Sequence, residues 1–237
     1  MNKSEKQRVE QATVRIKRWG GRGVLVPGEF VLTAAHCVNV PYTGGAVLGD
    51  YLWEEIETEK ETFRMGICAV EPVNDIAVLE EADNQVLPEI EGYKYLSFIE
   101  NTKPVPIYMS KLPSKGSLEV HVFTHLNKWN SGELFYYGIQ GNAHIKFHKK
   151  IIGGTSGSPI VSSEGELIGL VSNSCEQKIE NRYEGTCPLI RFALPVWLIT
   201  RILENQKSIK RKPVGPHPGQ RIKIPPLPKT KISRDRL

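Results

Sequence analysis

Three side chains suited to nucleophilic catalysis occur in the order His36, Asp75 and Ser156. A serine hydroxyl is a weak nucleophile at neutral pH, so it needs a neighbouring base to take its proton as it attacks. Histidine can act as that base because its ordinary pKa lies near neutral pH. A carboxylate can fix the tautomer of the imidazole and stabilise its charged form. These three residue types together predict acyl transfer through a serine nucleophile.

Each of the three residues stands in a short motif. His36 lies in Thr-Ala-Ala-His-Cys, Asp75 in Asn-Asp-Ile-Ala-Val-Leu, and Ser156 in Gly-Gly-Thr-Ser-Gly-Ser-Pro. Glycines beside a serine let the backbone turn so that its N–H groups converge on one point. Such donors can stabilise the oxyanion that forms during acyl transfer. Each residue taken singly could be an ordinary turn or core-edge residue, but the three motifs in this order favour one site.

These motifs resemble those of the trypsin/chymotrypsin-like serine proteases, over roughly residues 12–206. The resemblance implies that His36 is the general base, Asp75 its orienting carboxylate and Ser156 the nucleophile. It also implies an oxyanion hole made by the N–H groups of Gly154 and Ser156. Peptide-bond hydrolysis would pass through an acyl-enzyme, and the partner would be a protein or peptide substrate. Gly-x-Ser-Gly-Ser-Pro is more similar to the bacterial and viral members than to digestive enzymes.

One departure from the family concerns activation. Digestive relatives carry an Asp just before the nucleophile, where it receives the N-terminal ammonium after zymogen cleavage. Thr155 occupies that position here and cannot make the ion pair. The start of the chain also lacks an activation sequence such as Ile-Val-Gly-Gly. We therefore expect a member that needs no zymogen cleavage.

Substrate specificity is expected from two segments. In the family, the primary pocket is lined about six residues before the nucleophile, which is Lys150 here, and by the segment after Ser172. Ser172, Asn173 and Ser174 would pair with the substrate backbone as an added strand. Lys150 at the pocket base would disfavour Lys and Arg substrates and favour an acidic side chain. The alternative, that Lys150 points into solvent, stays open.

The pattern of short β-rich runs between Gly and Pro turns predicts a mostly β protein that ends in a helix. The resemblance implies an all-β fold of two six-stranded antiparallel β-barrels with a C-terminal α-helix. The N-terminal lobe would span residues 12–90 and carry His36 and Asp75. The C-terminal lobe would span residues 91–206 and carry Ser156 and the terminal helix.

Several segments receive local expectations. Residues 1–11 are predicted to be a polar lead-in, residues 41–62 to be loop-like, and residues 84–103 to connect the two lobes. Residues 191–194 are predicted to be the last strand. Pro195 at a first turn, followed by apolar residues at helical spacing, predicts an amphipathic helix.

Residues 207–237 form a basic, proline-rich segment. It holds ten Lys or Arg residues and one acidic residue, whereas residues 1–206 hold 21 basic and 25 acidic residues. The basic pI of the chain therefore comes from this tail. Such a composition buries too little apolar surface to fold, so we expect a solvated, disordered tail. A polyproline-binding partner, an acidic surface or nucleic acid are the alternatives for it.

The rest of the composition sets outer limits. The 237 residues are 40% hydrophobic and 24% charged, an ordinary globular balance. The polar N-terminus lacks the apolar core of a secretory signal, and no run is long enough to span a bilayer, so we expect a cytoplasmic protein without a membrane partner. No cofactor is expected, and neither the cysteines nor the other histidines show metal-ligand spacing.

The cysteines agree with a reducing compartment. Secreted relatives usually bridge the cysteine beside the catalytic His to one shortly upstream, but residues 1–36 contain no partner for Cys37. A bridge between Cys175 and Cys187 stays open, against the alternative of free thiols. Two functional alternatives to a peptidase also stay open. One is an inactive protease fold that binds a partner through its groove and tail, and the other is a nucleic-acid-associated protein.

Overall fold

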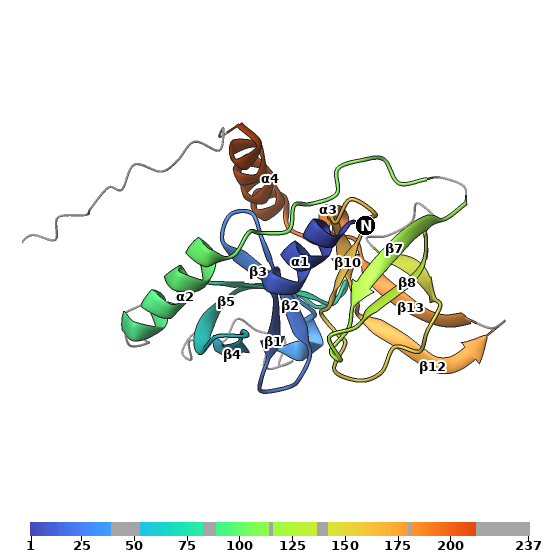
Figure 1. The fold of residues 1–237 in the computed structure, drawn as a ribbon, viewed down its shortest axis with the longest axis horizontal. Coiled ribbons are helices and arrows are strands. Elements are labelled where there is room, and N and C mark those ends of the chain that lie inside the picture. Colours follow the sequence, from blue (N-terminus) through green and yellow to red (C-terminus); the bar gives the residue numbers. More distant parts are fainter. Residues whose placement is uncertain (39–52, 83–88, 114–115, 137–141, 180–181, 212–237) are drawn as a thin grey trace, which may run out of the picture.

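The computed structural model describes residues 1–38, 53–82, 89–113, 116–136, 142–179 and 182–211 (Figure 1). Two β-sheets lie side by side, with strands β1 to β5 on one side of Figure 1 and strands β7, β8, β12 and β13 on the other. This arrangement places the segments that carry His36 and Asp75 in one half and the segment that carries Ser156 in the other.

The N-terminal half is a closed barrel of six strands in the order β1-β2-β3-β6-β5-β4. All neighbouring strands are antiparallel, and pairing of β1 with β4 closes the barrel. Its strands are β1 Thr13–Ile16, β2 Arg22–Val26, β3 Phe30–Thr33, β4 Trp53–Glu57, β5 Thr62–Glu71 and β6 Ile76–Glu80. Valine, isoleucine and phenylalanine dominate these strands because branched and aromatic side chains suit a pleated, buried surface.

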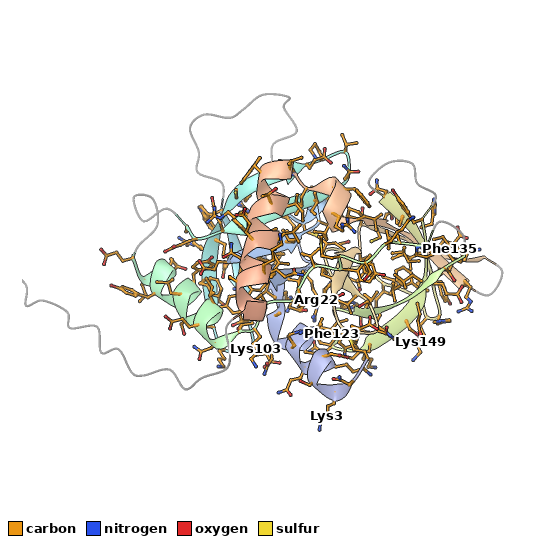
Figure 2. All side chains as sticks on the ribbon, turned by 90° about the horizontal axis from the view of Figure 1, so that it is seen from above. Lys3, Arg22, Lys103, Phe123, Phe135 and Lys149 are labelled. Atoms are coloured by element: carbon orange, nitrogen blue, oxygen red, sulfur yellow. The ribbon has the colours of Figure 1, made fainter. Side chains whose placement is uncertain are left out.

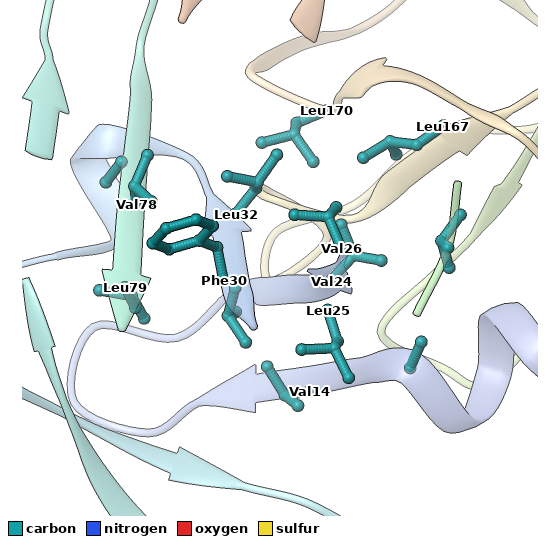
Figure 3. Close-up of a cluster of buried hydrophobic side chains, with 14 of the residues drawn as sticks. Val14, Val24, Leu25, Val26, Phe30, Leu32, Val78, Leu79, Leu167 and Leu170 are labelled. Carbon is teal, nitrogen blue, oxygen red and sulfur yellow. The ribbon is translucent and has the colours of Figure 1, made fainter. Parts of the chain in front are cut away.

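The core of the barrel continues into the second half of the protein. Every residue of β2 and β3 is buried, and Figure 3 shows Phe30 and Leu32 among side chains from several strands. Leu167 and Leu170 of the C-terminal half belong to the same buried cluster. Burying apolar surface from both halves in one cluster stabilises their contact, at roughly 25 cal/mol per Å² of apolar surface removed from water.

The C-terminal half is a sheet of seven strands in the order β11-β10-β7-β8-β9-β13-β12. An isolated bridge between Gly169 and Leu189 joins the edge strand β11 to the residue after β13, so the sheet curls back on itself. The predicted fold class is confirmed, although this half has one strand more than the six expected. Its strands are β7 Leu118–Phe123, β8 Trp129–Phe135, β9 Asn142–Phe147, β10 Pro159–Val161, β11 Leu167–Leu170, β12 Asn173–Ile179 and β13 Arg182–Pro188.

A helix stands where the sequence predicted only a polar lead-in. Helix α1 spans Lys3–Ala12, and Asn2 caps it by accepting from the Glu5 backbone N–H while the Glu5 side chain accepts from the Asn2 N–H. This reciprocal capping satisfies two of the backbone donors that a helix leaves unpaired. Val9 and Ala12 are fully buried against the barrel core. The prediction was wrong because α1 buries only two apolar residues, which are too few to form a periodic apolar stripe in the sequence.

Other local predictions had different outcomes. The expected connection between the lobes contains helix α2 Glu89–Asn101, which lies between the last strand of the first sheet and the first strand of the second. The prediction that residues 41–62 are loop-like was wrong where β4 lies inside that range. The expected last strand is a short helix, α3 Ile190–Ala193, because Ile190 and Ala193 are buried one turn apart. A short apolar run fits a strand and a buried helix equally well, so periodicity could not decide between them.

The C-terminal helix was predicted correctly in kind. Helix α4 spans Val196–Arg211, and the N–H groups of Leu198 and Ile199 both donate to Pro195 O. It therefore reaches beyond residue 206, the predicted end of the C-terminal lobe. The remainder of the predicted tail lies outside the described residues. None of the described helices has the length and apolarity needed to cross a membrane.

Substituting Val9 tests whether α1 belongs to the folded core. We expect Val9→Asp to lower the free energy of unfolding by about 3–5 kcal/mol, because it buries a charge without a partner. Gln7→Asp adds the same charge at an exposed position of the same helix. It should change the free energy of unfolding by less than about 0.5 kcal/mol. Urea denaturation followed by circular dichroism measures both values. Equal stabilities for the two variants would contradict the packing of α1.

Candidate active site

His36 and Asp75 are brought together by the pairing of β3 with β6. Thr33 of β3 lies opposite Ala77 of β6, so the turns that adjoin these strands must meet at one end of the barrel. His36 lies in the short 3₁₀ turn Ala35–Cys37 directly after β3, and Asp75 directly precedes β6. Asp75 has a φ of 57°, in the left-handed region that Asp tolerates better than most residues.

The carboxylate of Asp75 is held by several donors. His36 Nδ1 lies 2.8 Å from Oδ2 and 3.0 Å from Oδ1, and the backbone N–H of His36 donates to Oδ1 at 3.0 Å. The hydroxyl of Ser172, from the other half of the protein, donates to Oδ2 at 2.5 Å. An ionised carboxylate can only accept hydrogen bonds, so His36 carries a proton on Nδ1. In the neutral ring, Nε2 is then the basic nitrogen.

These contacts shift the pKa values of both groups. Burial opposes ionisation of Asp75, but the hydrogen bonds from the His36 ring, Ser172 and the His36 N–H outweigh it and hold the pKa of Asp75 below its ordinary value. The hydrogen bond with Asp75, followed by one with Cys37, raises the pKa of His36 to about 10, although burial of the ring acts in the opposite direction. The pair therefore favours an imidazolium beside an ionised carboxylate.

Ser156 lies in the turn of residues 153–158, which we call the nucleophile turn. Its carbonyl oxygen accepts from the N–H of Arg22 on β2 at 2.7 Å, and the N–H of Gly157 donates to Val171 O at 2.7 Å. The turn is thereby tied to both halves of the protein. Within the part of the chain that the structure describes, neither the Gly154 N–H nor the Ser156 N–H donates a hydrogen bond, so both donors are available to a ligand.

Close backbone approach brings the nucleophile turn next to the segment of His36. A Cβ on Gly21 would lie 2.5 Å from Cys37 Sγ and 3.0 Å from Ser156 O, so Gly21 sits between the two segments. Ser156 Oγ makes no hydrogen bond with His36 among the described residues. Such catalytic hydrogen bonds often tighten only when substrate binds.

The four residues predicted to bind substrate are placed differently from one another. Lys150 and Asn173 are exposed, and Ser174, described only by its backbone, pairs with Gly185 in β12 and β13. Ser172 lies at the start of this segment, where its N–H donates to Thr186 O. Its side-chain bond to Asp75 was missed from the sequence, because a serine between two strands carries no sign of a partner 97 residues away.

The described cysteines are free thiols. Cys187 is fully buried, and burial raises the pKa of its thiol well above the ordinary value. The pairing with Cys175 that the sequence left open involves a side chain outside the described part of the structure. The described residues contain no group of three or more His, Cys, Asp or Glu side chains that could hold a metal ion.

The Trypsin family model matches residues 2–194. The serine endoprotease from Yersinia pestis is 19% identical, with a TM-score of 0.55 over 89% of this chain and 68% of that one. The active form of Rv3671c protease from M. tuberculosis is 14% identical, with a TM-score of 0.54 over 84% of this chain and 83% of that chain. An inactive-form mutant of Rv3671c is 16% identical, with a TM-score of 0.51 over 90% of this chain and 94% of that chain. No curated protein matches.

Gly157 offers a test of how tightly the nucleophile turn is packed. A Cβ there would lie 1.9 Å from the backbone oxygen of Arg22, at a φ of 75° that disfavours any L side chain. We expect Gly157→Ala to lower the free energy of unfolding by about 2 kcal/mol or more, since both strain and overpacking contribute. Gly153→Ala is the control, because a Cβ there meets nothing within 4 Å. Thermal denaturation measures the stability of both variants. A Gly157→Ala variant as stable as Gly153→Ala would contradict this packing.

Proposed function

We propose that this chain, which belongs to the trypsin family of serine endopeptidases, hydrolyses peptide bonds with His36, Asp75 and Ser156 as its catalytic residues. The observation that carries the proposal is the hydrogen-bonded pair of His36 and Asp75, beside which Gly21 contacts the nucleophile turn. These contacts support a common site for a base, its orienting carboxylate and a serine hydroxyl at the junction between the two halves.

The reaction begins when neutral His36 accepts the proton of Ser156 Oγ on Nε2. The oxygen attacks the peptide carbonyl, and the resulting oxyanion accepts from the N–H groups of Gly154 and Ser156, which have no other acceptor among the described residues. The imidazolium then gives its proton to the leaving amine, and the C–N bond breaks to leave an acyl-enzyme. A water molecule, deprotonated by the same imidazole, releases the acid and restores Ser156.

Asp75 stabilises the imidazolium that forms in each step and stays ionised itself. Its remaining lone pairs are occupied by Ser172 Oγ and the His36 N–H, which keeps the carboxylate in one orientation. This arrangement fixes the ring of His36 with Nε2 as the base. Ser172 therefore supports catalysis from the C-terminal half by holding a carboxylate of the N-terminal half.

Protein or peptide substrates fit this chemistry, with residues 172–174 pairing with the substrate backbone. An acidic preference through Lys150, which is exposed, stays a prediction. Binding of a partner or nucleic acid by residues 207–237, and a cytoplasmic location, also remain predictions. No observation favours the alternative of a catalytically inactive binding module.

Active-site labelling tests the nucleophile. We expect an alkyl fluorophosphonate to label the protein at one site per chain, and Ser156→Ala to abolish both the label and the cleavage of denatured casein. Ser163→Ala is the matched control, because Ser163 is an exposed serine in the next turn. Intact mass spectrometry measures the label. Wild-type protein that is folded but remains unlabelled at pH 7–9 would rule out the proposed activity.

The raised pKa of His36 predicts an alkaline activity profile. Only the neutral ring can accept the proton of Ser156, so kcat/KM should rise with pH, with a midpoint well above the ordinary 6.5 and towards 10. Asp75→Asn removes the main cause of the shift and should lower kcat by about 10⁴-fold, as the same change does in a trypsin triad. Initial rates between pH 5 and 10.5 check both effects. A midpoint at or below 6.5 would show that Asp75 does not stabilise the charged ring.

A further inference from the structure

Thr155 stands between the two proposed oxyanion donors, and a histidine outside the triad contacts it. The side chain of Thr155 is 1% exposed, and its hydroxyl oxygen lies 2.9 Å from His125 Nδ1. The His125 ring also lies against Gly154, where a Cβ would be 3.5 Å from its Cγ. One ring thus contacts both residues that precede Ser156.

His125 belongs to a turn whose backbone is itself well fixed. The turn follows β7, and its ends are joined by hydrogen bonds from the N–H and the hydroxyl of Thr124 to Lys128 O, at 2.9 and 3.0 Å. The N–H of Asn127 donates to Thr124 O at 2.9 Å. The ring is therefore presented to the nucleophile turn from a short loop with little freedom.

Arg22 braces this loop from the N-terminal barrel. Its guanidinium donates to His125 O at 3.2 Å and to Asn127 Oδ1 at 2.6 Å. The same group packs 4.9 Å from the ring centroid of Phe123, and Figure 2 shows the two side chains next to each other. The backbone N–H of Arg22 also holds Ser156 O. With only 9% of its surface exposed, Arg22 reaches the nucleophile turn directly and through His125.

We propose that His125 is a positioning residue, which holds Thr155 and thereby keeps the N–H groups of Gly154 and Ser156 aimed at the oxyanion. The proposal rests on the function proposed above. It gives this chain a neutral hydrogen bond at the place where digestive relatives use a charged pair made on activation. Oxyanion donors are effective because they are fixed before the reaction, so loosening their support lowers the rate of the chemical step.

The surroundings of His125 leave open space beside Thr155 when the ring is truncated. His125, Arg22 and Gly154 line a cavity of about 370 Å³, so a smaller side chain at position 125 leaves open space beside Thr155. Solvent entering there would compete for the Thr155 hydroxyl. Loss of the ring should therefore change the orientation of the Gly154 and Ser156 N–H groups, and leave Ser156 Oγ and the His36–Asp75 pair unchanged.

The test separates binding from chemistry in the reaction with an alkyl fluorophosphonate, whose phosphoryl oxygen occupies the place of the oxyanion. We expect His125→Ala to lower the maximal phosphonylation rate about 10–100-fold, because removing an oxyanion donor outright costs about 10²–10³-fold and this change only loosens the donors. The reagent concentration that gives half the maximal rate should change little. His125→Asn, whose amide can still reach Thr155 Oγ1, should restore most of the rate. His121→Ala is the matched control, because His121 is a half-buried histidine on the adjoining strand β7.

Thr155→Val provides a second route if His125→Ala folds poorly, since it removes the hydroxyl and keeps the volume. Its effect should match that of His125→Ala, and the double variant should be no slower than either. Amide exchange gives a readout independent of activity. The hydrogen-bonded amides of Arg22, Gly157 and Ser158 should exchange faster in His125→Ala than in His121→Ala.

The outcomes are distinct. If the wild type is labelled but His125→Ala reacts and exchanges like His121→Ala, the positioning role is overturned while the proposed function stands. If His125→Ala and His125→Asn are equally slow, the hydrogen bond to Thr155 is not the cause, which also overturns the role. A folded wild type that is never labelled overturns the proposed function and, with it, the role of His125.

Discussion

The close backbone contact between β2 and the nucleophile turn is the constraint on which the rest of the site depends. Arg22 donates from its N–H to Ser156 O, and its own carbonyl oxygen accepts from Thr33 Oγ1 at 2.6 Å. Gly157 lies so near that oxygen that no side chain fits. Residues from two separate sheets can meet only because this junction excludes side chains, and a buried backbone junction of this kind must have its polar groups paired.

Two sets of side-chain bonds cross the same junction at different places. Ser172 reaches from the C-terminal half to Asp75, and the Arg22 guanidinium reaches from the N-terminal barrel to the loop of His125. The first fixes a charge that would be costly to bury unpaired. The second fixes backbone donors that carry no charge of their own. In the proposed mechanism, support for the base is therefore separate from support for the oxyanion donors.

The electrostatic balance at Asp75 explains how the base is set. A half-buried carboxylate stays ionised because three donors hold it, and the ionised group in turn stabilises the charged ring of His36. The benefit is a stronger base and a stabilised imidazolium. In the proposed mechanism, the accompanying cost is that His36 of the free enzyme holds its proton at neutral pH, which would move the active form to higher pH.

Much of the fold and of the candidate site could be predicted from the sequence. The motifs around His36, Asp75 and Ser156 predicted the family and the two-lobed β architecture, because catalytic chemistry restricts which residue types can stand in those turns. Local periodicity failed for α1 and for α3, where a few buried residues decide the outcome.

What the sequence by itself determined is therefore the set of reactive groups and the type of architecture that carries them, since both depend on residue types within short motifs. Only the tertiary structure decided that Ser172 holds Asp75 and that His125 holds Thr155. These pairs join residues that are 97 and 30 positions apart in the chain. Their meeting depends on the packing of whole strands and turns, which no local pattern encodes.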